Sequence, residues 1–142
     1  MKEYLCVIAG AIGSFILALF GGWDTSLQTL IIFMIIDYIT GVLVAGVFHN
    51  SPKTEGGGLE TRAHFKGLCK KIVALTMVIV AYHLEMLSDI NMIRNTVIIA
   101  LVANETISIL ENAGLMGIPI PKVLKNALVV LQEQEGNDDE NI

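Results

Sequence analysis

Asp37 stands in the apolar stretch FMIIDYITG, where a carboxylate could relay protons, line an ion path or bond across a helix contact. The nearest charged residues along the chain are Asp24 and Lys53, so its own segment offers no neutralising charge. An isolated ionised carboxylate in an apolar environment carries a large desolvation cost. We therefore expect Asp37 to be protonated, or to face a partner group or water.

Small and polar residues recur every four positions in three apolar segments, and one of these stripes contains Asp37. Residues at this spacing share one face of a helix. Small side chains there let two helix backbones approach closely, and polar ones bond across the contact. The stripes comprise Gly10, Ser14, Ala18 and Gly22 in the first segment, Asp37, Gly41 and Ala45 in the second, and Ala100, Asn104, Ser108 and Asn112 in the last.

These stripes leave two main hypotheses open. In the first, they pack helices within one monomer. In the second, some of them join subunits, and Asp37, Asn104 and Glu105 line a wet surface in the assembly. A dedicated proton or ion relay is disfavoured, because no second carboxylate lies one turn from Asp37.

Other kinds of chemistry find no support in the sequence. Cys6 and Cys69 have no metal-ligand spacing, and His83 and Glu85 are two positions apart, so they do not share a helix face. No nucleophile elbow, zinc-protease motif or phosphate-binding loop is present. We expect no enzyme activity, catalytic residue, metal site or cofactor, and no nucleic-acid partner, because basic patches with aromatic residues are absent.

The composition predicts an all-α membrane protein built from helical hairpins. Of its 142 residues, 54% are hydrophobic and 16% are charged, whereas soluble domains carry about 25% charged residues. Four apolar segments approach the roughly 20 residues that cross a bilayer. They span about residues 4–22, 27–48, 68–87 and 95–113. Three spans are the alternative, because Glu105 interrupts the last segment.

The second segment has enough apolar residues to carry Asp37 into a membrane. A central Asp costs roughly 2.5 to 3.5 kcal/mol on insertion scales, and each Leu, Ile, Phe or Val contributes roughly 0.3 to 0.6 in return. Thirteen such residues lie between Leu27 and Phe48. Their sum of about 4 to 8 kcal/mol exceeds the cost, so insertion of this segment is expected.

The distribution of basic residues predicts the topology. With four spans, eight of the nine Lys and Arg residues fall on one side, and only Arg94 falls on the other. Because basic residues concentrate on the cytoplasmic side, both termini are predicted there. The cluster formed by Lys66, Lys70 and Lys71 is then expected to anchor the chain at the anionic inner leaflet.

The C-terminal part is expected to hold an amphipathic helix and a disordered tail. Pro119 and Pro121 end the preceding segment, and apolar residues at helical spacing over 121–131 predict a helix on the membrane surface. Residues 132–142 contain five acids and no base, which is typical of a disordered tail. Residues 1–131 would form the membrane domain.

Three stretches together resemble the toxin-secretion/phage-lysis holin family of Gram-positive phages and prophages. They are GGWDTSLQTLIIFMIIDYITGVLVAG, FKGLCKK and ANETISILENAGLMGIPIPKVL. The resemblance runs from about Gly21 to Leu131 in the right order. Members of this family are often drawn with three spans, whereas the charge distribution here favours four.

The resemblance implies a protein that accumulates in the bacterial host cytoplasmic membrane and assembles into homo-oligomeric lesions. Through these an endolysin, with which no tight complex is expected, or a toxin leaves the cell and lysis follows. Two alternatives remain. A small ion or proton channel would pass ions yet retain proteins, and an antiholin-type regulator would change the timing of a second pore-forming protein.

Overall fold

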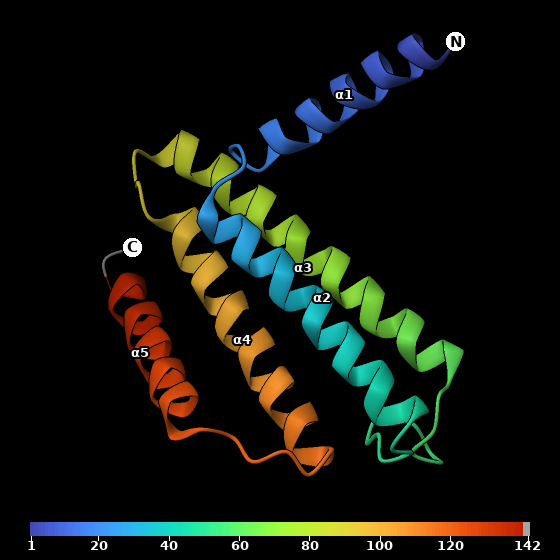
Figure 1. The fold of residues 1–142 in the computed structure, drawn as a ribbon. Helices are drawn as coiled ribbons and strands as arrows, with labels where there is room; N and C mark the ends of the chain where they lie inside the picture. Colours follow the sequence, from blue (N-terminus) through green and yellow to red (C-terminus); the bar gives the residue numbers. More distant parts are fainter. Residues whose placement is uncertain (141–142) are drawn as a thin grey trace.

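The computed structural model describes residues 1–140 and contains five α-helices and no strand within that range (Figure 1). Four of the helices are long and apolar enough to cross a membrane, which confirms the prediction of an all-α protein with four candidate spans. The helices are α1 (Lys2–Leu19), α2 (Thr25–Gly46), α3 (Thr61–Ser88), α4 (Ile93–Leu115) and α5 (Lys122–Asp139).

Helices α2, α3 and α4 form a bundle, and α5 lies along α4 (Figure 1). Within the bundle α3 runs opposite to α2 and α4, as successive hairpins require. Helix α1 projects away from the bundle, and none of residues 2–19, all of which the structure describes, is buried.

The turn between α1 and α2 depends on a glycine and an N-terminal cap. Gly21 has a φ of +82°, and a Cβ atom there would lie 2.6 Å from the Tyr82 ring, so no other residue fits without displacement. The Asp24 side chain then accepts a hydrogen bond of 2.9 Å from the Leu27 amide. This cap satisfies one of the free N–H groups at the start of α2.

An apolar cluster holds the three bundle helices together at one end of the bundle. Its members are Leu27, Leu30 and Met34 on α2, Val78 on α3, and Ile98 and Val102 on α4. Many large apolar side chains point outward instead, among them Ile35 and Val73. Lipid is the solvent that matches such a surface.

Two element boundaries differ from the prediction. Helix α3 begins at Thr61, seven residues before the expected start of the span at residue 68. Helix α5 continues to Asp139, so residues 132–139 are helical and not disordered. Acidic residues do not break a helix by themselves, since Glu has good helix propensity. The expected disorder at 141–142 concerns residues outside those described.

Helix α5 also differs in placement from the expected surface helix. It packs along α4, with Leu131 against the apolar cluster (Figure 1). The apolar face that we expected to enter the bilayer surface is thus partly covered by a neighbouring helix. A period within one helix indicates an apolar face, but it cannot say which apolar surface will cover that face.

Candidate functional site

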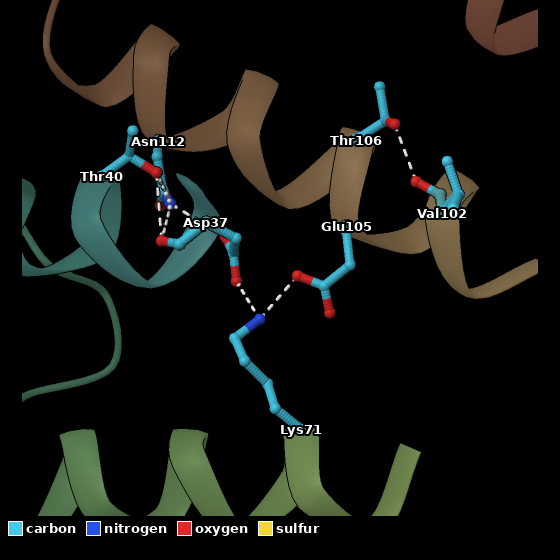
Figure 2. A network of polar contacts seen from close by, with 7 residues as sticks. All are labelled: Asp37, Thr40, Lys71, Val102, Glu105, Thr106 and Asn112. Atoms are coloured by element: carbon cyan, nitrogen blue, oxygen red, sulfur yellow. Dashed lines mark hydrogen bonds and ion pairs between the residues drawn. The ribbon is translucent and has the colours of Figure 1, made fainter. Parts of the chain in front are cut away.

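An ion triad joins the three bundle helices where the sequence placed an isolated carboxylate (Figure 2). Lys71 of α3 donates from Nζ to Asp37 Oδ2 of α2 at 2.7 Å. The same Nζ donates to Glu105 Oε2 of α4 at 2.5 Å. The three side chains are only 8–15% exposed. We call Asp37, Lys71 and Glu105 the ion triad.

Asn112 of α4 completes the hydrogen bonding of Asp37 (Figure 2). Its Nδ2 donates to Asp37 Oδ1 at 3.1 Å and to Thr40 Oγ1 at 2.9 Å. The Ser108 side chain also bonds with Asp37. Both carboxylate oxygens of Asp37 therefore have partners, which is what a buried charge requires.

The triad carries a net charge of −1 when all three groups are ionised. Two carboxylates face one ammonium, so their attraction to Lys71 offsets part of the desolvation cost but leaves one negative charge in excess. In a membrane this arrangement needs a proton, a counter-ion or water nearby. The triad is therefore a polar centre inside the bundle that needs such compensation.

The stripe Asp37, Gly41, Ala45 packs against other helices of its own chain. Asp37 is 7% exposed and Ala45 is fully buried. A Cβ atom on Gly41 would lie 3.8 Å from Asn112 Nδ2, so this glycine faces α4. In this structure the stripe serves contacts within the monomer, the first of the two hypotheses.

The other candidates fall into two groups. Glu105 and Ser108 join Asp37, whereas Asn104 is exposed on α4 and lines a cavity beside Asp37 and Glu105. The α1 stripe of Gly10, Ser14 and Ala18 is exposed along its whole length.

The three predicted inner-leaflet anchors differ in their exposure to solvent. Lys66 and Lys70 are exposed near the start of α3, where an anchor would lie. The expectation for Lys71 is wrong, because its ammonium is buried between two carboxylates and does not reach the surface. Two short ion pairs hold the side chain inward against its tendency to extend toward water.

A second ionic cluster, which sequence reasoning missed, lies at the other end of the bundle. Arg94 of α4 donates from Nη1 to Asp24 Oδ2 at 2.6 Å and from Nε to the Phe20 carbonyl at 2.6 Å. Its backbone N–H donates to Glu85 Oε2 at 2.9 Å. Arg94 is 7% exposed, so this cluster ties the α1–α2 turn to α3 and α4.

The Asp24 carboxyl responds to these partners. Partial burial alone would raise the pKa of Asp24, but hydrogen bonds from Arg94 and the Leu27 amide, together with the Arg94 charge, hold that pKa below its ordinary value of 3.8. One sequence signal pointed here: Arg94 is the single base on its side of the predicted membrane.

Comparison with known proteins identifies the family. The sequence model of the bacteriophage holin family matches residues 14–133. This chain belongs to the bacteriophage holin family. The matched range contains the ion triad, the second ionic cluster, helices α2 to α4 and residues 122–133 of α5.

Individual relatives of this holin-family chain come from phages and bacteria. A probable holin of Bacillus phage phi105 is 30% identical over 115 residues, which cover 80% of this chain and 79% of that protein. An uncharacterized protein of Listeria monocytogenes is 38% identical over 123 residues, covering 86% and 82%. An uncharacterized 14.9 kDa protein of Clostridium perfringens is 34% identical over 127 residues, covering 88% and 90%. No solved structure matches the chain.

Proposed function

We propose that this holin-family chain accumulates in the cytoplasmic membrane of a bacterial host and assembles there into homo-oligomeric lesions. An endolysin, or a toxin, passes through these lesions without forming a tight complex with the holin, and timed lysis follows. The family match over residues 14–133 is the observation that carries this proposal. The four apolar helices are consistent with it.

We further propose that both termini lie in the cytoplasm, which requires α5 to separate from α4, because in the structure α5 runs back along α4 toward the end of the bundle that carries Arg94 (Figure 1). Helices α1 to α4 would cross the membrane in alternating directions, with Arg94 on the outer side and the other bases on the inner side. Exposed Lys66 and Lys70 would then lie at the anionic inner leaflet, where each contributes about 1 kcal/mol of attraction.

Assembly requires a face that the monomer leaves uncovered. The α1 stripe of Gly10, Ser14 and Ala18 is exposed, so it is the best candidate for contact with a second copy. Small-residue and polar contacts in membranes contribute about 0.6 to 2 kcal/mol each. Many weak contacts of this kind would make assembly depend steeply on subunit concentration, which is a physical basis for timing.

The test is inducible expression with and without a cytoplasmic endolysin. Expression alone should stop growth abruptly and release a protein-sized cytoplasmic reporter, and lysis should follow only when the endolysin is present. A chain that passes small ions but retains the reporter would instead be a channel. A channel is the second candidate function, because ionisable residues such as those of the ion triad often line ion pathways in membrane proteins. No killing alone, with altered timing beside a known holin, would identify an antiholin.

A further inference from the structure

A cavity of about 400 Å³ adjoins the ion triad. Its walls come from α2, α3, α4 and the connection between α2 and α3. The lining residues that matter here are Asp37, Ser51, Lys53, Gly67, Lys70 and Ala74. By volume the cavity accommodates on the order of ten water molecules.

The cavity extends from one end of the bundle to the middle of a span. Ser51 and Lys53 lie beyond the end of α2, whereas Asp37 lies nine residues before its last residue, Gly46. At 1.5 Å rise per residue this is a depth of about 14 Å. That is roughly half of the ~30 Å hydrocarbon core of a bilayer.

The apolar cluster lies beyond the inner end of the cavity. Val78 lies one turn beyond Ala74 on α3, and its side chain is fully buried. Leu30 and Ile98, from the two other helices, are 0% and 1% exposed. Close-packed side chains of this kind leave no space for water.

The charges fit a cavity that is wet from one end only. Exposed Lys53 lines its outer part, and exposed Lys70 lines its wall next to Lys71 of the triad. With all three groups ionised, the triad at its inner end carries one uncompensated negative charge, which water would stabilise far better than lipid. Ionisable residues inside membrane spans generally face water-filled cavities or one another, and this geometry provides both.

We propose that this cavity is a one-sided aqueous vestibule, through which water and small hydrophilic solutes reach the ion triad from the end that carries residues 51–54. The vestibule belongs to the single subunit and exists before any assembly. The inference rests on the membrane placement of the four helices, and it does not depend on lysis or endolysin release.

Single-cysteine labelling tests the vestibule in the full-length chain. Cys6 and Cys69 are first replaced by Ser, and one cysteine is then introduced as Gly67→Cys, Ala74→Cys, Val73→Cys or Val78→Cys. A Cβ atom at Gly67 meets no atom within 4 Å, so this variant should fold. The probe is the charged, membrane-impermeant thiol reagent 2-sulfonatoethyl methanethiosulfonate, applied to right-side-out and inside-out vesicles.

The neighbouring positions on α3 serve as matched controls. Val73 is 56% exposed and points outward at the same depth as Ala74, and Val78 lies inside the apolar cluster. Because only a hydrated thiol ionises and reacts, cysteines at 67 and 74 should react about tenfold or more faster than those at 73 and 78. Glu55→Cys, in the exposed connection, reports which membrane face carries residues 51–54.

The expected result is labelling of Gly67→Cys and Ala74→Cys only from the face that labels Glu55→Cys. The proposal is overturned if Ala74→Cys reacts as slowly as Val73→Cys, because the cavity is then dry or filled by lipid. It is also overturned if Ala74→Cys reacts equally from both faces, because the apolar cluster then does not close it. Neither labelling outcome predicts the result of the lysis assay, so the vestibule and the proposed holin function are tested separately.

Discussion

At the scale of the residue, Lys71 determines how two carboxylates are tolerated inside the bundle. It is the single ammonium between Asp37 and Glu105, and its Nζ makes both short contacts. A buried ion pair adds little net stability against an apolar replacement, but loss of one partner leaves an uncompensated charge. The effect of substitution should therefore depend on how many of the three charges are removed together.

Replacing Lys71 alone should destabilise the bundle strongly. In Lys71→Met, Asp37 and Glu105 would face each other without a cation, and removing one partner of a buried pair costs roughly 3–5 kcal/mol. Thermal unfolding in detergent micelles, followed by circular dichroism, measures the loss. Lys66→Met, at an exposed position of the same helix, should change the unfolding temperature little.

A charge-free triple variant distinguishes electrostatics from packing. Asp37→Asn, Lys71→Met and Glu105→Gln together preserve side-chain size but remove every charge of the triad. This variant should recover most of the stability that Lys71→Met loses. Equal instability of the single and triple variants would show that the Lys71 side chain matters for its shape and not for its charge.

The Arg94–Asp24 pair should make stability depend on pH in the acid range. Because the pKa of Asp24 is lowered on folding, the unfolded chain binds a proton more readily. The stabilisation is therefore complete above the ordinary value of 3.8 and is lost as the pH falls through the lower pKa of the folded state. Unfolding temperatures in micelles between about pH 5 and pH 2 measure this loss, since the usual Asp pKa lies near 3.9.

The matched variant for this measurement is Asp24→Asn. Asn remains a good N-cap residue but carries no titratable charge. Subtracting its pH profile from that of the natural chain removes the contribution of the other carboxylates. A difference that stays constant across the acid range would contradict the role assigned to the Asp24 charge.

At the scale of the element, the contact between α2 and α4 depends on the absence of a side chain at Gly41. A Cβ atom at this position would make an ordinary contact of 3.8 Å with Asn112 Nδ2, so Gly41→Ala should be tolerated. Gly41→Leu adds three more carbon atoms in the same direction and should displace the Asn112 amide from Asp37. Overpacking of this kind costs roughly 1–3 kcal/mol.

The pair Gly41→Ala and Gly41→Leu should differ both in stability and in lysis timing. Unfolding in micelles and the time of lysis after induction measure the two effects. Gly46→Leu, at the end of α2 where a Cβ atom meets no atom within 4 Å, is the size-matched control. If Gly41→Leu and Asp37→Asn both leave lysis time and cross-linked oligomer ladders unchanged, the Asp37 stripe is neither an assembly face nor a timing element.

Helix α1 buries none of its residues in the monomer. Gly10→Leu should reduce the cross-linked oligomer fraction and delay lysis, because a bulky residue would separate two α1 helices that approach through their small faces. Ile12→Leu, on the opposite side of the same exposed helix, should have little effect. Unchanged oligomer ladders in Gly10→Leu would show that the subunits do not assemble through the α1 stripe.

At the scale of the whole molecule, the acidic end of the chain lies on a helix that partly covers α4. The last eleven residues hold five acids and no base, and with them the chain has a net charge of −5. Deleting residues 132–142 removes this charge and much of α5, which should weaken its packing on α4 and bring lysis forward. The time of lysis after induction measures the effect.

A full-length variant separates the charge from the helix. Replacing Glu133, Glu135, Asp138, Asp139 and Glu140 by Gln or Asn keeps the length but removes the five charges. Lysis should keep its natural time in this variant if α5 acts through its packing on α4. An advance equal to that of the deletion would instead assign the effect to charge alone.

The sequence by itself determined the four apolar helices and the polar positions that need partners. These follow from local causes: apolar length sets a span, and a chain in lipid must satisfy its backbone N–H and C=O groups within each helix. The family resemblance had the same local basis, because its motifs are continuous stretches of the chain. The structure departed from expectation at element ends such as residues 61 and 139, in the packing of α5 along α4 and in the burial of Lys71.

Only the tertiary structure decided which partner each polar residue has. Lys71 is 34 positions from both Asp37 and Glu105, and Arg94 is 70 positions from Asp24. A helical period relates residues on one helix, but it contains nothing about the rotation of one helix against another. The neighbouring bases in the sequence therefore predicted that Lys71 is a surface anchor. The packing of α2, α3 and α4 instead places it at the centre of a buried ion triad.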